Sequence, residues 1–164
     1  MVKSRKMSWT AMLIALSAVG ASIKIPAPVG SVALDSFPAL LAAGLFGGPA
    51  GAAAGSLGHL LSALIGGMPL GPFHILIAGE MALLAYLFAL LYKNDKRWYA
   101  GILFIIGNSF AAPLPFILFM GLPFYLAIVP SLFISSVLNT VLTFLVLPRI
   151  AKVLEHSLPF SRET

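Results

Sequence analysis

Six apolar runs account for most of the chain and constrain its fold more than any other feature. Glycine- and proline-containing turns or charged clusters separate the runs, which cover residues 8–24, 37–47, 50–66, 72–92, 99–120 and 125–148. A helix needs about 20 apolar residues to cross a bilayer. Because 60% of the 164 residues are hydrophobic and 9% are charged, little sequence remains for a soluble domain. The sequence therefore predicts one domain over residues 1–164, an all-α integral membrane protein folded as a compact bundle of six transmembrane helices.

The positions of the basic residues predict the orientation of this bundle. Cytoplasmic segments of membrane proteins are enriched in Lys and Arg. If residue 1 lies in the cytoplasm, nine of the ten basic residues fall in cytoplasmic segments, namely the head, the 93–98 loop and the tail at 149–164. The tenth, Lys24, lies at a helix end, where its aliphatic stem lets the ammonium group reach the membrane surface. We therefore expect both termini to be cytoplasmic.

Two of the runs allow another interpretation. Residues 37–47 are short for a span, so a re-entrant segment is the alternative to a tilted helix. Residues 1–24 combine a basic head with an apolar centre, as a cleaved signal peptide does. Against cleavage, Ala11, Ala15 and Ala18 share one helical face, and small residues on a face let a second helix approach closely. A signal peptide does not need such a face.

Glu80 is the most informative polar residue because it lies in an apolar run with no basic residue near it in sequence. A carboxyl group at membrane depth costs about 2.5–3.5 kcal/mol on insertion scales, so it normally faces the protein interior and serves a function. Asn108 lies near the middle of the fifth run. In the sixth run, polar residues at every fourth position share one helical face: Ser131, Ser135, Asn139 and Thr143. We expect this face to point inward and, together with Glu80 and Asn108, to surround a small polar ligand.

Structural roles are the alternative for two of these side chains. A protonated Glu80 bonded to a backbone carbonyl of a neighbouring helix would need no ligand. His59, in the third run, either bonds to a neighbouring helix or reaches the site. Two connections rich in Gly and Pro lie opposite the termini, and we expect them to act as gate loops around Asp35 and Pro72. The first of them, residues 25–36, is expected to lack regular structure.

The chain lacks the motifs of several enzyme classes. It contains no Cys, which excludes disulfides and thiolate metal sites. It has no Gly-rich loop ending in Lys-Ser or Lys-Thr, no His-Glu-x-x-His pair and no Gly-x-Ser-x-Gly motif. We therefore expect no catalytic residue, metal or cofactor. A membrane enzyme with His59 or His74 as base is the weakest alternative. The net charge of +5 follows the predicted topology and does not indicate a nucleic-acid partner.

The order of these features resembles that of the substrate-binding S components of energy-coupling factor (ECF) vitamin transporters. The chain has a basic head, an Ala-x-x-x-Ala motif at Ala11 and Ala15, a long first external loop and a matching segment at 37–51. The resemblance implies a multi-pass protein of the bacterial plasma membrane. Its partners would be a transmembrane coupling subunit, contacted by the face that holds Ala11, Ala15 and Ala18, and two subunits that hydrolyse ATP. The substrate site would open outward.

The aromatic residues indicate the kind of ligand. Several phenylalanines and few charges near the outer end favour a flat, largely uncharged aromatic molecule. Among S components the chain looks most similar to α-ribazole transporters, which take up a nucleoside precursor of cobamides. The residues expected to bind substrate are Glu80, Asn108, Asn139, Phe73, His59, Ser135 and Phe116. The alternative function is a stand-alone small-solute channel or a proton-coupled permease that uses Glu80.

Overall fold

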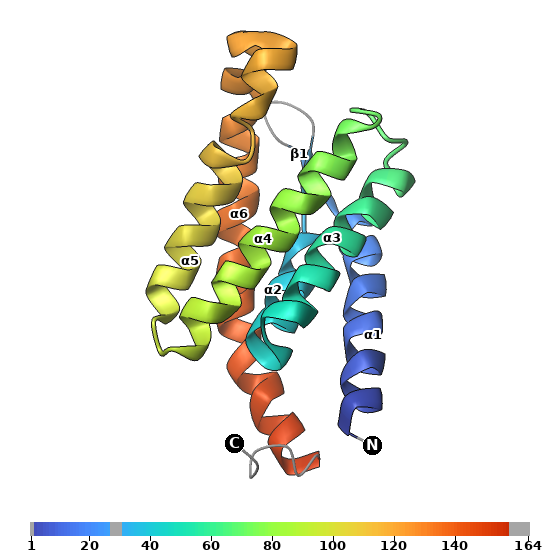
Figure 1. Cartoon of the computed structure of the whole chain (residues 1–164), viewed down its shortest axis with the longest axis vertical. Coiled ribbons are helices and arrows are strands. Elements are labelled where there is room, and N and C mark those ends of the chain that lie inside the picture. Colours follow the sequence, from blue (N-terminus) through green and yellow to red (C-terminus); the bar gives the residue numbers. More distant parts are fainter. Residues whose placement is uncertain (1, 27–30, 158–164) are drawn as a thin grey trace.

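Helices make up most of the computed structural model, which describes residues 2–26 and 31–157 (Figure 1). α1 begins and α6 ends at the same end of the bundle, as an even number of crossings requires (Figure 1). The predicted helical bundle is therefore confirmed for the described residues, apart from one short hairpin. The elements are α1 (Val2–Ser22), β1 (Lys24–Pro26), β2 (Ser31–Ala33), α2 (Ser36–Phe46), α3 (Gly48–Ile65), α4 (Phe73–Lys93), α5 (Arg97–Ile106), η1 (Gly107–Ala111) and α6 (Pro115–Ser157).

The connection between α1 and α2 contains a hairpin. β1 pairs with β2 in antiparallel register, with Lys24 opposite Ala33. The amide of Leu34 also donates to the carbonyl oxygen of Gly20, at 3.2 Å, which ties the hairpin to the end of α1. The expectation that residues 25–36 lack regular structure is therefore wrong for 25–26 and 31–33, while residues 27–30 lie outside the described part of the chain. The two ends of the connection pair with each other because their backbone groups need hydrogen-bond partners.

The fifth apolar run does not form one straight helix. α5 ends at Ile106, the π-helical segment η1 follows, and α6 begins at Pro115. Pro113 and Pro115 have no amide hydrogen, so an α-helical ladder cannot continue unbroken through them. α6 itself is two helices that meet at Gly121, where φ is 83° and ψ is 165°. The chain reverses there and then runs to Ser157, beyond the end of the predicted sixth span (Figure 1).

α2 lies at the centre of the bundle. Eight of its eleven residues are buried, and it packs against α1, α3, α4 and α6. Leu41 belongs to a core cluster that includes Leu13 of α1. Leu40 belongs to a second cluster, with Phe88 of α4 and Phe104 of α5. This short helix therefore joins the two halves of the hydrophobic core.

Glycines let α3 approach its neighbours closely. α3 packs against α1, α2 and α4. A Cβ atom at Gly55 would lie 2.7 Å from the carbonyl oxygen of Met81 in α4, and one at Gly58 would lie 2.6 Å from Oγ of Ser17 in α1. Both distances are shorter than van der Waals contact. Only glycine allows these helix separations, as in small-residue packing between membrane helices.

Two helices of the described chain are long and apolar enough to cross a membrane, namely Phe73–Lys93 and Pro115–Leu154. α2 is a shorter apolar helix. The outer faces of the two long helices carry exposed apolar side chains, such as Leu83 of α4 and Leu126 of α6. Their inner faces contribute several polar and aromatic side chains to a cavity.

Candidate binding cavity

A cavity of about 340 Å³ lies between α3, α4, η1 and α6. It adjoins the α3–α4 connection, at the end of the bundle opposite the start of α1 (Figure 1). Its volume falls within the range of roughly 300–1,000 Å³ that is typical of small-molecule sites. The lining residues are His59, Pro69, Leu70, His74, Ile77, Glu80, Asn108, Ala112, Pro113, Phe116, Ile128 and Leu132.

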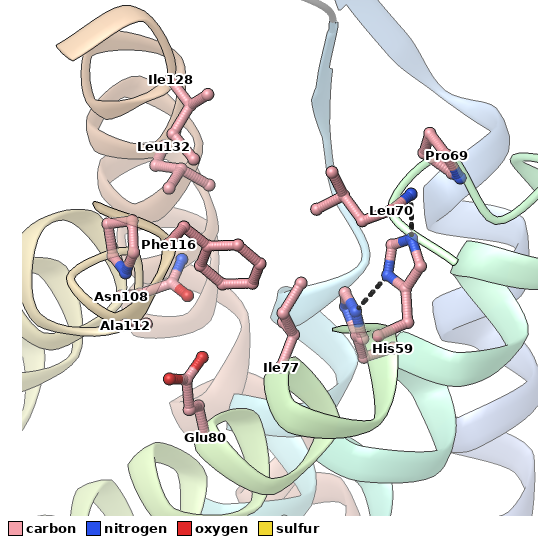
Figure 2. A pocket seen from close by; sticks show the side chains of 12 residues that line it. His59, Pro69, Leu70, Ile77, Glu80, Asn108, Ala112, Phe116, Ile128 and Leu132 are labelled. Atoms are coloured by element: carbon pink, nitrogen blue, oxygen red, sulfur yellow. Dashed lines mark hydrogen bonds between the residues drawn. The ribbon is translucent and has the colours of Figure 1, made fainter. Parts of the chain in front are cut away.

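Glu80 brings a carboxyl group into this cavity from α4. Figure 2 shows the carboxyl group pointing toward Asn108. The Oε2 atom of Glu80 is buried and has no hydrogen-bond partner among the described residues. An unpaired buried polar atom costs about 1–3 kcal/mol. A hydrogen-bond donor on a bound molecule would remove this cost.

Asn108 faces the cavity from the π-helical segment η1. Its Nδ2 atom donates to Oγ of Ser136 at 2.9 Å. Ser136 is 1% exposed, accepts from Oγ of Ser109 at 3.2 Å and donates to the carbonyl oxygen of Leu132 at 2.7 Å. π-Helical turns occur frequently at functional sites. Here the segment sends Asn108 to the cavity and Ser109 into the core.

Two histidines form the wall on the other side of the cavity. Nε2 of His59, on α3, lies 3.1 Å from Nδ1 of His74, on α4. The amide of Leu70 donates to Nε2 of His74 at 3.3 Å, so that nitrogen is an acceptor. A neutral His74 then carries its proton on Nδ1 and donates it to His59. This chain of hydrogen bonds ties the α3–α4 connection to both helices.

Phenylalanine rings form an aromatic wall. Phe116 of α6 lines the cavity and is 2% exposed. The ring centroid of Phe73 lies 5.7 Å away in a T-shaped arrangement, and Phe73 also contacts Phe119 with a centroid distance of 5.0 Å. Phe124 packs against Phe116 as well, at 6.2 Å. Such a wall suits the face or edge of a flat aromatic ligand.

The structure brings together four of the seven residues that were expected to bind substrate: Glu80, Asn108, His59 and Phe116. Phe73 does not line the cavity, but it touches the aromatic wall through Phe116. Asn139 and Ser135 lie elsewhere. The expected polar face of the sixth run does point inward, since Asn139 and Thr143 are both 0% exposed.

Asn139 caps a helix and does not line the cavity. Its Oδ1 atom accepts the amide of Phe37 at 2.7 Å, and its Nδ2 atom donates to the carbonyl oxygen of Ser135 at 2.8 Å and to Oγ of Ser135 at 3.2 Å. The first amides of a helix have no intrahelical acceptor, so Asn139 caps α2 from α6. The expected cluster of Glu80, Asn108 and Asn139 is thus corrected to Glu80 and Asn108.

The expected gate residues lie outside the cavity lining. Oδ2 of Asp35 accepts from Oγ of Ser62 at 3.0 Å, and Oδ1 accepts from Oγ of Ser36 at 3.3 Å. Asp35 therefore links the start of α2 to α3. Pro72 is exposed and directly precedes α4, two residues after Leu70, which does line the cavity.

One face of α1 is open at the edge of the bundle (Figure 1). Ala11 and Ala15 are exposed, and Ala18 is half-buried. The opposite face, with Leu13 and Ser17, is buried where α1 packs against α2 and α3. The small-residue face is therefore accessible to another helix.

Ser136 and His74 are not among the residues that the sequence predicted to bind substrate, although the sequence offers His74 as a base in the enzyme alternative. Ser136 directly follows the expected polar position 135, and a helix with 3.6 residues per turn shifts its inner face onto adjacent positions. Helical spacing therefore could have predicted that the Ser136 side chain faces the protein interior. The pairing of His74 with His59 depends on the path of the α3–α4 connection, which the sequence does not specify. In the described part of the chain, no group of three or more potential metal ligands comes together.

Comparison with known proteins gives one match. A family model described as "ECF transporter, substrate-specific component" matches residues 5–156. This range includes every residue that lines the cavity. No curated protein and no solved structure matches the chain.

Proposed function

Because this chain belongs to the family of substrate-specific components of ECF transporters, we propose that its cavity captures a vitamin-sized aromatic molecule from outside the cell. Members of the family are membrane-embedded, bind small substrates and work with transmembrane and ATPase modules. The observation that carries the proposal is the unpaired Oε2 atom of Glu80 beside a cavity of about 340 Å³. A donor group on a bound substrate would give this oxygen a hydrogen bond.

Each wall of the cavity has a proposed role. Glu80 and Asn108 bond the polar part of the substrate, and Phe116, supported by Phe73, contacts its flat part. His59 contributes to the wall that is tied to the α3–α4 connection. The lead substrate is α-ribazole, whose dimethylbenzimidazole would lie against the phenylalanines and whose ribose hydroxyls would bond to Glu80 and Asn108.

The partner contact is proposed for the exposed face of α1. Ala11 and Ala15 leave room for a helix of the transmembrane coupling subunit. In this arrangement ATP hydrolysis belongs to two partner subunits, and this chain catalyses no reaction. The protein would lie in the bacterial plasma membrane as a multi-pass subunit.

The first test measures binding of α-ribazole to the purified protein. We expect Glu80→Gln to weaken binding at least about tenfold, which is roughly 1.4 kcal/mol, because the amide cannot accept as strongly as the carboxyl group it replaces. Asp95→Asn is the matched control, since the Asp95 side chain is 92% exposed and lies in the α4–α5 connection. Equal affinity of the Glu80→Gln variant and the wild type would return Glu80 to a structural role.

The second test measures uptake into vesicles that contain the partner module. Ala11→Trp combined with Ala15→Trp should abolish uptake and leave binding intact, because the bulky side chains block the partner helix. Leu83→Trp, on the exposed face of α4, is the control and should transport normally. Transport by this chain alone, without partners, would instead support a channel or permease.

A further inference from the structure

The hydrogen bonds of Ser136 determine which end of the Asn108 amide faces the cavity. A serine hydroxyl donates one proton and accepts through two lone pairs. The proton of Ser136 goes to the carbonyl oxygen of Leu132 at 2.7 Å. The oxygen therefore accepts from Nδ2 of Asn108 and from Oγ of Ser109. With its nitrogen held by Ser136, Asn108 turns Oδ1 toward the side of Glu80 (Figure 2).

Glu80 adds a second acceptor to the same wall. A carboxyl group keeps at least one acceptor oxygen in either protonation state. Its Oε2 atom has no partner within the described chain. No Lys or Arg is among the described residues that line the cavity. A negatively charged ligand would therefore be buried beside Glu80 without a compensating cation, which is unfavourable.

The histidine wall has little free hydrogen-bonding capacity. Three of the four ring nitrogens of His59 and His74 are engaged with each other or with the amide of Leu70. The remaining side chains of the lining are apolar and belong to Pro69, Leu70, Ile77, Ala112, Pro113, Phe116, Ile128 and Leu132. Polar recognition in this cavity therefore falls to Glu80 and Asn108.

We propose that the cavity selects an uncharged or cationic ligand that presents two neighbouring hydrogen-bond donors to Glu80 and Asn108, and that Ser136 is the positioning residue for this selection. The inference rests on the proposed function, because it specifies the ligand class of the same site. Vicinal hydroxyl groups on a ligand with an aromatic body meet the requirement. A molecule that offers only acceptors at this point, or an anion, does not.

Binding titrations with three matched probes test the inference: α-ribazole, its 2′,3′-dideoxy analogue and its 5′-phosphate. The wild type should bind α-ribazole at least about tenfold more tightly than either of the other two, since two hydrogen bonds are lost or a charge is added. In Ser136→Ala the Asn108 amide is free to turn. The preference for α-ribazole over the dideoxy analogue should then fall to within about threefold, while the affinity for the dideoxy analogue stays unchanged.

Two further variants keep the result interpretable. Ser56→Ala is the control, because Oγ of Ser56 donates to the carbonyl oxygens of Ala52 and Ala53 in its own helix, so the wild-type preference should remain. Asn108→Leu removes the acceptor directly and should lower the preference as Ser136→Ala does. If Ser136→Ala keeps the wild-type preference while Asn108→Leu lowers it, Ser136 has no positioning role. If Asn108→Leu also keeps the preference, Asn108 does not recognise the donors and the inference is overturned.

The inference is overturned if the wild type binds α-ribazole and its dideoxy analogue equally, if it prefers the phosphate, or if it binds none of the three probes. The proposed function fails by a different measurement. If the expected selectivity is found but vesicles with the partner module show no ATP-dependent uptake, the ligand class stands and the transport role does not.

Discussion

Glu80 and Asn139 are both polar residues in apolar helices, yet the structure gives them different surroundings. Oε2 of Glu80 lies at a cavity and has no hydrogen-bond partner in the part of the chain that the structure describes. Asn139 is completely buried, and its side chain bonds to Phe37 and Ser135. Sequence alone presents both as inward-facing hydrogen-bonding groups at similar depth. What separates them is whether a partner from the protein is in reach, and for Asn139 that partner comes from residue 37, 102 positions away in the chain.

The hydrogen bond by which Asn139 caps α2 predicts a change in stability when this residue is replaced. Asn139→Leu keeps the number and branching of the side-chain heavy atoms but removes the acceptor for the Phe37 amide, and an unpaired buried amide costs about 1–3 kcal/mol. We expect a lower melting temperature of the detergent-solubilised protein and, below that temperature, unchanged ligand affinity. Asn94→Leu, at the exposed end of α4, is the control. A variant with normal stability but weakened binding would show that Asn139 belongs to the site after all.

At the scale of elements, the apolar runs predicted a helical bundle, because length and hydrophobicity favour helices in such segments. The sequence did not specify the backbone details that shape the cavity. Pro113 and Pro115 indicate that a helix is interrupted, but not that η1 precedes the break and turns Asn108 inward. The β1–β2 pairing was missed because its strands are only three residues long. Such features depend on neighbouring elements, so local patterns do not reveal them.

The close packing of α3 against α4 predicts that alanine substitutions at two glycines have different effects on stability. Gly55→Ala should destabilise the protein, because the added Cβ would lie 2.7 Å from the backbone oxygen of Met81, and α3 and α4 would have to separate. Gly79→Ala is the matched change on α4, where no described atom beyond its chain neighbours and its own turns of helix lies within 4 Å of the added Cβ. It should be neutral or stabilising by up to about 1 kcal/mol, since alanine favours a helix more than glycine does. Thermal unfolding of both variants checks this, and equal stabilities would contradict close α3–α4 packing.

The arrangement of the whole molecule predicts its orientation in the membrane. α1 begins and α6 ends at one end of the bundle, where the α4–α5 connection with its basic residues also lies. The cavity lies toward the other end. Because cytoplasmic segments are enriched in Lys and Arg, we propose that the cavity end faces the outside of the cell.

Cysteine labelling of intact cells tests this orientation, because the natural chain contains no Cys. With a membrane-impermeant maleimide, Pro69→Cys should react in intact cells, whereas Asp95→Cys should react only after the cells are opened. Both positions are exposed and lie in connections between helices. The reverse pattern would invert the proposed topology and place the cavity on the cytoplasmic side.

The length of α6 has a consequence for the shape of the protein at the membrane surface. From the reversal at Gly121 to Ser157 the helix holds 36 residues, and at 1.5 Å per residue it extends about 54 Å. The hydrocarbon layer of a bilayer is about 30 Å thick. Even a moderate tilt cannot bring the whole helix into that layer. Because Arg149 and Lys152 make one end of this helix polar, we expect that end, on the side where α1 begins, to be the part that lies outside the lipid tails.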